Sequence, residues 1–394
     1  MRTRINKLLT LLCTVACLIL LAAYTQLPLQ YIDNLPDSAK ISIADIGSIQ
    51  GKNLSVDYDI VQSASVDGDA NGTINIKAFG FFPVKKVKVK VEPNRKVFSG
   101  GQPIGLMLNS NGVIVINSGN VKTKDGIKGN TALKKGDIIK KINDTTILTP
   151  KCIAKYFKEN SCDKINLTIE RNGKTIVLKT QPLYDSVNEE YKLGAWVKDK
   201  IAGLGTISYV KLDGNFGALG HPVIDGDTNV VFNIYNGQVY DAKVVGVEKG
   251  QPGKAGALKG VFNASDGKIG TVHTNNKYGI FGRLNKQIDE NIISVGSRLS
   301  VKPGRAKIIS TIGDKIDEFD IEIVKTHSQK KKSDKSMVVK VVDSRLLDAT
   351  GGIVQGMSGS PIVQDGKVVG AITHVFVNDP TRGYGIYMDW MYDN

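Results

Sequence analysis

The chain has 394 residues, of which 41% are hydrophobic, 7% aromatic and 23% charged. This composition is typical of globular proteins and excludes a largely disordered or collagen-like chain, while the length is enough for two or three domains. The net charge of +14 favours acidic partners in general and does not choose among nucleic acid, anionic lipid and an acidic protein surface. Four cysteines are too few for a disulfide-based fold, and 42 glycines against 12 prolines favour a strand-rich protein.

The N-terminus combines a basic flank with an apolar run. Two arginines and Lys7 precede residues 8–23, which are almost entirely apolar, and no further charge appears before Asp33. This pattern predicts a signal peptide or an uncleaved signal anchor over residues 1–33. Positively charged residues that flank an apolar segment remain on the cytoplasmic side of the membrane. We therefore expect the rest of the chain to be exported across, or anchored in, the cytoplasmic membrane. A buried N-terminal helix is the alternative.

Two cysteines lie outside the apolar run. Cys152 and Cys162 are ten residues apart, so they could pair in an exported domain, and two unlinked thiols fit equally well. The sequence has no CxxC motif and no cluster of histidines and cysteines. We therefore expect no metal and no cofactor.

Residues 34–96 are expected to form an N-terminal β segment. Val84–Val91 largely alternates valine with lysine, which predicts a half-buried edge strand with a basic outer face. The stretch from Asn34 to about Asn75 is polar and rich in turn residues, so we expect an exposed linker in which proteolytic processing costs little. No arrangement of aromatic and basic residues predicts a nucleic-acid partner.

Residues 97–183 have the pattern of a separate α+β module. The segment GDIIKKIN (136–143), a helical stretch at 150–158 and a hairpin across 171–174 together resemble a PDZ domain of the bacterial protease type. The resemblance implies a groove that takes a peptide as an added strand. The residues expected to line that groove are Ile104, Gly105, Leu106 and Met107.

The strand- and glycine-rich region 184–394 contains a candidate nucleophile. Ser358 lies in GMSGSP and is followed by two apolar strands joined through Asp365-Gly366, the signature of a tight hairpin. Glycines on both sides let the backbone turn sharply and let a carbonyl group approach, so the N–H groups of Gly356 and Ser358 are candidates for an oxyanion hole. A structural Gly-Ser turn is the alternative.

The GMSGSP turn resembles the GDSGGP turn of chymotrypsin-like proteases, with Met357 in place of the usual aspartate. That aspartate often pairs with a processed N-terminus. Its replacement argues against activation of the zymogen type and leaves the nucleophile in place.

A serine nucleophile needs a base, and the chain has four histidines. His221 lies in a glycine-rich segment and is restrained by Pro222, which makes it the preferred base. Of the others, His273 falls at a possible strand end, His327 adjoins a charged loop, and His374 is expected in the core or a pocket wall.

A catalytic triad also contains a carboxylate that orients the imidazole. Asp343, fifteen residues before Ser358, is the preferred candidate, with Asp348, Asp225 and Asp227 as rivals. The order His221, Asp343, Ser358 is that of chymotrypsin-type enzymes, whose catalytic domains are all-β double barrels.

Three longer motifs carry a resemblance to a known family. FGALGHPVID (216–225), DSRLLDATGGIVQGMSGSPIV (343–363) and GYGIYMDWM (383–391) are similar to the stage IV sporulation protein B peptidases of endospore formers. The resemblance implies a mainly β fold, a chymotrypsin-like double β-barrel over 184–394, with the α+β PDZ-like domain inserted or preceding. It also implies His221, Asp343 and Ser358 as the catalytic residues.

Members of this family are secreted serine peptidases that cleave themselves near the N-terminus. From the space between the two forespore membranes they then cut a membrane-bound regulator, which leads to activation of a late mother-cell sigma factor. By this resemblance the partners are a protein or peptide substrate, the chain itself and the membrane. The alternatives are a catalytically inactive exported PDZ adaptor and a basic surface that binds polyanions.

Overall fold

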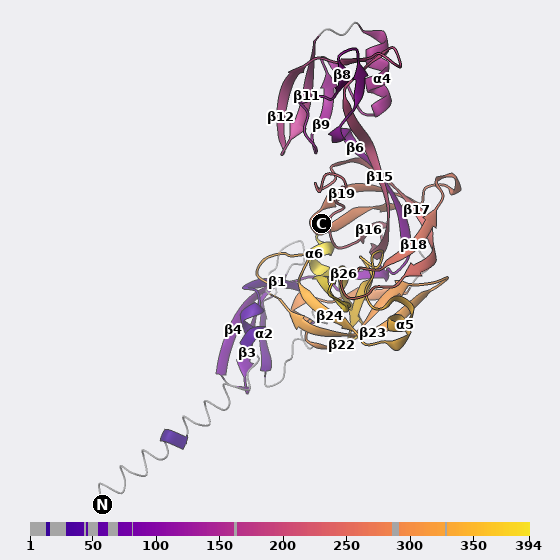
Figure 1. Ribbon diagram of the computed structural model, residues 1–394. Helices are drawn as coiled ribbons and strands as arrows, with labels where there is room; N and C mark the ends of the chain where they lie inside the picture. Colours follow the sequence, from indigo (N-terminus) through magenta and orange to yellow (C-terminus); the bar gives the residue numbers. More distant parts are fainter. Residues whose placement is uncertain are drawn as a thin grey trace, which may run out of the picture.

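The computed structural model describes residues 13–15, 29–42, 45, 54–61, 70–80, 82–160, 164–285, 291–327 and 329–394. Most of the predicted membrane segment, residues 1–33, lies outside the described residues. Within the described ranges, no helix is long and apolar enough to cross a bilayer. The described chain is mainly β-structure, as predicted, and comprises an N-terminal sheet, two rings of strands and a lobe that projects from the first ring (Figure 1).

The N-terminal sheet has the strand order β1-β4-β3-β2. Alternate valines of β4 are buried and its lysines face outward, so the predicted amphipathic strand is confirmed. Because β4 pairs with both β1 and β3, it is an internal strand and not the predicted edge. The elements are α2 (Leu29–Asn34), β1 (Ser38–Ile41), β2 (Leu54–Val61), β3 (Ala70–Ala78) and β4 (Phe82–Val91).

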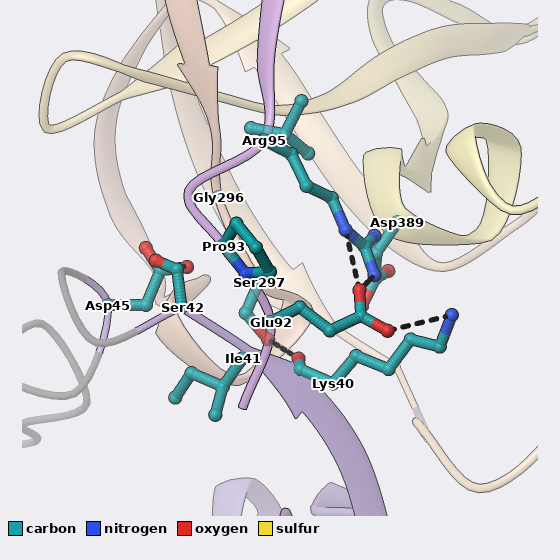
Figure 2. A pocket seen from close by; sticks show the side chains of 11 residues that line it. Lys40, Ile41, Ser42, Asp45, Glu92, Pro93, Arg95, Gly296, Ser297 and Asp389 are labelled. Carbon is teal, nitrogen blue, oxygen red and sulfur yellow. Dashed lines mark hydrogen bonds and ion pairs between the residues drawn. The ribbon is translucent and has the colours of Figure 1, made fainter. Parts of the chain in front are cut away.

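Polar contacts and one leucine join this sheet to the rest of the molecule. Figure 2 shows the Glu92 carboxylate between two cations, with its oxygens 3.1 Å from Lys40 Nζ and 3.0 Å from Arg95 Nε. In the same pocket the Ser297 hydroxyl donates to the Lys40 carbonyl over 3.1 Å. Leu299 is buried in the apolar core of the sheet. The sheet is therefore packed onto the domain that follows it.

The expectation of an exposed linker over residues 34–75 is wrong for the described part of that window. The described residues there end α2 and form β1, β2 and the first half of β3. Ala39, Ile41 and Ile74 are buried in the core of the sheet. Polar turn residues dominate the composition of this window, but the few apolar residues recur at strand spacing and pack together.

Six of the described strands form the first ring. Their antiparallel pairings run β15–β16–β20–β19–β17–β6 and return to β15, around a core that includes Phe216 and Val239. The ring strands are β6 (Pro103–Ser118), β15 (Ala195–Lys211), β16 (Asn215–Ala218), β17 (Ile234–Glu248), β19 (Gly270–Asn276) and β20 (Gly279–Leu284). The elements at its margin are β5 (Lys96–Ser99), β18 (Ala257–Phe262) and the 3₁₀ turn η1 (Ala264–Asp266).

Six other described strands form the second ring, with pairings β22–β23–β24–β27–β26–β25 and back to β22. Its core includes Met337, Ile362 and Met357. The strands are β22 (Gly304–Thr311), β23 (Ile316–Thr326), β24 (Met337–Val341), β25 (Pro361–Gln364), β26 (Lys367–Phe376) and β27 (Asp379–Tyr387). Around it lie β21 (Ile292–Val295), η2 (Arg298–Ser300), α5 (Ser344–Thr350) and α6 (Met388–Tyr392).

The lobe is inserted between β6 and β15 of the first ring. The predicted helix is present as α4, with Ile153 and Phe157 buried, and the predicted hairpin turns at Asn172-Gly173 with positive φ at both residues. The lobe has its own core, which draws on residues between Val113 and Leu193. Its elements are β7 (Val121–Thr123), β8 (Gly126–Lys128), β9 (Ile138–Ile142), β10 (Thr145–Thr146), α4 (Pro150–Glu159), β11 (Ile165–Arg171), β12 (Lys174–Thr180), β13 (Leu183–Asp185) and β14 (Glu190–Lys192).

One of the two cysteines that could form a disulfide lies in this lobe. Cys152 is a free thiol whose Sγ lies 3.2 Å from Thr149 Oγ1. Cys162 lies outside the described residues. The pairing of the two stays a prediction.

The predicted peptide groove at Ile104, Gly105, Leu106 and Met107 is wrong. These residues belong to β6 inside the first ring and not to the lobe. One edge of this stretch pairs with β15 and the other with β17, so neither edge can accept an added strand. Ile104 and Leu106 are buried in the ring core. An apolar strand beside glycines has the same local pattern in a ring as in a PDZ groove.

Candidate active site

Ser358 stands on a tight turn in the second ring, just before β25. Gly356 and Gly359 on either side have φ of 95° and 99°, a region that glycine enters without strain. Met357 between them is fully buried in the apolar core. The hairpin predicted to follow is confirmed, since β25 and β26 pair around Asp365 and Gly366, both with positive φ.

The serine turn is held against the first ring by Thr206 of β15. The Thr206 N–H donates to the Ser358 carbonyl over 3.1 Å, and the Thr206 hydroxyl donates to the Gly356 carbonyl over 2.7 Å. A Cβ atom on Gly359 would lie 2.1 Å from the Thr206 carbonyl oxygen. Only glycine at position 359 permits this approach, so the nucleophile turn lies where the two rings meet.

His221 comes from the first ring, in the turn that follows β16. The two residues before it, Leu219 and Gly220, have φ of 66° and 72°, and the strain at a leucine in this region is typical of functional turns. A Cβ atom on Gly220 would lie 2.8 Å from Thr373 Cγ2 of β26. The turn therefore presses against the second ring beside the serine hairpin.

The contacts of His221 favour one tautomer. Nδ1 lies 2.8 Å from the Pro222 carbonyl oxygen, and only a protonated Nδ1 can donate to a carbonyl. This leaves Nε2 with a free lone pair, the form that a general base needs. Burial lowers the pKa of His221 below its usual value of 6.5, against the smaller raising effects of the Pro222 carbonyl and Asp334. The imidazole is therefore neutral at neutral pH.

The structure brings His221 and Ser358 to the same two residues of β26. The Ser358 hydroxyl donates to the Thr373 carbonyl over 2.9 Å, and the next residue, His374, has its ring centre 5.0 Å from that of His221. In this state the hydroxyl is bonded to a carbonyl and not to the imidazole. Catalytic hydrogen bonds are often formed only when substrate is bound.

Of the remaining histidines, His374 lies beside His221. His374 lines a cavity together with His221, which confirms it as a pocket-wall residue. Burial and the neighbouring His221 lower the pKa of His374 to about 4. His273 is exposed on β19, and His327 is half-buried with its ring beside Tyr384.

Asp343 is not beside the histidines, which corrects its prediction as the orienting carboxylate. It caps the N-terminus of α5, where its oxygens accept from the Arg345 backbone N–H and guanidinium and from the Asp320 N–H. The Arg345 guanidinium lowers the pKa of Asp343 to about 2. On β24, Val338 pairs with Tyr384 of β27, and Tyr384 pairs in turn with His374. Asp343 lies five residues after Val338, beyond the other end of β24. Five residues of extended chain span roughly 16 Å, so Asp343 lies about that far along the chain from the level of His374.

The carboxylate that the structure places at the histidines is Asp334. Its Oδ2 lies 3.9 Å from His374 Nε2, and its charge raises the pKa of both His374 and His221. Asp334 belongs to the lysine-rich loop before β24, which by composition is a solvated loop. Among the rivals of Asp343, Asp225 is buried and bonded to Lys198 and to its own turn, and Asp348 is exposed on α5.

The predicted oxyanion hole involves the N–H groups of Gly356 and Ser358. Within the described ranges, no backbone carbonyl accepts a hydrogen bond from either group. Both are therefore available to a substrate oxygen. Their convergence on one substrate atom stays a prediction.

The comparison with family models identifies this region as a peptidase. The family model described as SpoIVB peptidase S55 matches residues 189–392, slightly more than half of the chain and a span that contains His221 and Ser358. No curated protein matches the chain. Among solved structures the chain is similar to "Crystal structure of Rv3671c protease, inactive form", with 13% identity, 49% of this chain and 82% of that chain covered, and a TM-score of 0.27.

Proposed function

The chain belongs to the SpoIVB peptidase S55 family and is a serine peptidase, in which we propose that Ser358 is the nucleophile and His221 the general base. The observation that carries this proposal is the meeting of the two residues at Thr373-His374, from opposite rings. Residues placed at a junction of two domains by strained turns are typical of catalytic groups.

In the proposed reaction, Ser358 turns its hydroxyl from the Thr373 carbonyl to Nε2 of His221. The histidine takes the proton as the Ser358 oxygen attacks the scissile carbonyl carbon. The Gly356 and Ser358 N–H groups receive the negative oxygen, and each such donor is worth about 3 kcal/mol in the transition state. His221 then gives the proton to the leaving amine, and water releases the acyl group by the same steps.

In this proposal the Pro222 carbonyl orients His221 by accepting a hydrogen bond from its Nδ1, and Asp334 provides a negative charge nearby. A carbonyl fixes the tautomer as an aspartate does, but it carries no full charge to stabilise the imidazolium. Asp334 supplies that charge through His374, which lies between the carboxylate and His221. The order His221, Asp334, Ser358 keeps the chymotrypsin-type sequence of groups.

The two six-stranded rings support a chymotrypsin-like double β-barrel as the fold of the catalytic unit. By family membership we infer a role in sporulation, in which the exported enzyme cuts a membrane-bound regulator in the forespore intermembrane space. Self-cleavage near the N-terminus is part of the same inference. The substrate is a protein chain in each case, since the family acts on peptide bonds.

The lobe is proposed to bind an extended peptide, at a place different from the one predicted from sequence. A hollow lies between α4 and the start of β15, lined by Ile153, Phe157 and Trp196. Residues Ala195–Lys198 pair with β6 on one edge, and no other described strand takes their second edge. Trp196 is 61% exposed and Trp390 is buried, so a peptide that binds here should change the fluorescence of Trp196. A Trp196→Phe variant is the control.

The central test compares Ser358→Ala and His221→Ala with His273→Ala, a histidine exposed on the same ring. Cleavage of a peptide substrate and N-terminal sequencing of the purified protein are measured for each. The proposal expects the first two variants to lose cleavage and the third to keep it. A Ser358→Ala protein that cuts substrate and processes itself like the wild type would refute Ser358 as the nucleophile. A wild-type protein that cleaves neither the peptide nor itself would favour the inactive adaptor.

A further inference from the structure

An apolar cavity opens beside His221. Its volume is about 400 Å³, within the range of roughly 300–1,000 Å³ that ligand sites occupy. The walls come from β6, β15, the turn 219–224 and His374 of β26, and apart from the two histidines every lining residue is apolar. The main side chains are Leu106, Leu108, Ile201, Leu219 and Ile224.

Strand geometry gives the cavity its floor. Leu106 pairs with Gly203 and Leu108 pairs with Ile201, and partners directly opposite in a sheet share one face. Gly205, two residues further, has the same orientation, and a Cβ on it would lie 2.5 Å from Leu219. A Cβ on Gly203 would meet no atom within 4 Å. The missing side chain at position 203 therefore leaves part of the empty space.

The position of the cavity relates it to the reaction. His221 forms part of its wall, so a group in the cavity lies next to the residue that moves protons to and from the scissile bond. His374 of β26 also lines it and belongs to the second ring, which carries Ser358 and the proposed oxyanion donors, while the remaining walls belong to the first ring. A substrate held between His221 and Ser358 would therefore lie beside this cavity.

We propose that this cavity is a specificity site that takes an aliphatic or aromatic side chain of the substrate at a residue flanking the scissile bond. The inference rests on the proposed function and adds the substrate class. Removing a large apolar side chain from water stabilises the complex, while a charged side chain would lose its hydration without gaining a partner. The enzyme should therefore reject acidic and basic residues at that position.

The test uses peptides that vary one residue at a time around a fixed cleavage site, with leucine, phenylalanine, alanine, aspartate or lysine at each position. At one flanking position the wild type should cut the leucine or phenylalanine peptide at least about tenfold better in kcat/KM than the alanine peptide. Equal rates for all five residues at every flanking position would overturn the proposal.

Two variants locate that preference in the cavity. Gly203→Leu fills the space and should remove the advantage of the leucine and phenylalanine peptides over the alanine peptide. Ile224→Lys puts a cation at the 52% exposed rim and should shift the preference toward the aspartate peptide. Gly246→Val, on β17 outside the cavity, is the matched control and should retain the wild-type preference.

Labelling with a serine-directed fluorophosphonate counts intact sites, so a folding defect is not mistaken for altered specificity. A fully labelled Gly203→Leu protein with wild-type preferences, or an Ile224→Lys protein with no change toward aspartate, would refute the proposal. Failure of the proposed function is a different result, namely cleavage that survives Ser358→Ala.

Discussion

Replacing Asp343 separates a structural role for this residue from a catalytic one. Its side chain is 7% exposed and bonded to Arg345, which lowers the pKa of Asp343 from 3.8 to about 2. A shift of nearly two pKa units corresponds to about 2.5 kcal/mol, and we reduce this to about 1–2 kcal/mol because Arg345 is 57% exposed to screening solvent. Asp343→Asn keeps an oxygen that can cap α5, so it should lower the free energy of unfolding by about 1–2 kcal/mol and no more.

Asp343→Ala also removes the cap of α5, which adds about 1 kcal/mol. We expect each kcal/mol to lower the melting temperature by about 2–4 °C. The sign with pH follows from the lowered pKa. The stabilisation is complete above pH 3.8, the unfolded value, and is lost as the pH falls toward 2, so the difference between wild type and Asp343→Asn should shrink over that interval.

The assay pairs thermal unfolding at pH 7 with kcat/KM for one peptide, and Asp348→Asn on the exposed face of α5 serves as control. Both Asp343 variants should melt earlier and, below their melting temperatures, cleave within about twofold of the wild type, since Asp343 touches neither histidine. An Asp343→Asn protein of unchanged melting temperature that loses kcat/KM by a hundredfold or more would refute this reasoning and restore Asp343 to the catalytic group.

Three further predictions follow from the site. Because burial lowers the pKa of His221, kcat/KM should rise with pH through a midpoint below 6.5, and a midpoint above 7 in a pH profile would contradict the proposed environment. Asp334→Asn should lower kcat/KM roughly fivefold, the effect of about 1 kcal/mol from a half-exposed charge, and move that midpoint to lower pH. An unchanged midpoint would show that the charge of Asp334 does not act on His221. Gly359→Ala places a Cβ against the Thr206 carbonyl and should abolish activity, whereas Gly366→Ala, with similar φ and open space, should only lower stability by about 1–2 kcal/mol in denaturant unfolding.

The serine turn could be predicted from sequence because its determinants are local. Gly356, Ser358 and Gly359 and the Asp365-Gly366 hairpin lie within about ten residues, and turn chemistry alone specifies their backbone. The turn at His221 is also predictable, because Gly220 permits a sharp turn and Pro222 restrains the backbone at His221. Neither prediction depended on which strands pair.

Which carboxylate lies near the histidines could not be predicted in the same way. Asp334 precedes β24 and Asp343 follows it, and both are close to Ser358 in sequence. Only the pairing of β24 with β27 determines which end lies at His374. The misplaced groove has the same cause, because the apolar pattern of Ile104–Met107 does not reveal that both edges of β6 are paired.

The inserted lobe and the cavity share two strands, which would connect the proposed peptide binding with cleavage. β6 lines the cavity at Leu106 and Leu108, and β15 lines it at Ile201–Leu204. Both strands extend into the lobe, where their paired ends contribute to its core. The pairing shifts register between Lys198 and Lys200, so the two segments are joined by a bulge and not by a continuous flat ribbon. A peptide added beside Ala195–Lys198 would lie on the strand that leads, within a few residues, to the cavity wall beside His221. The lobe therefore stands where it can present a bound substrate to the catalytic junction.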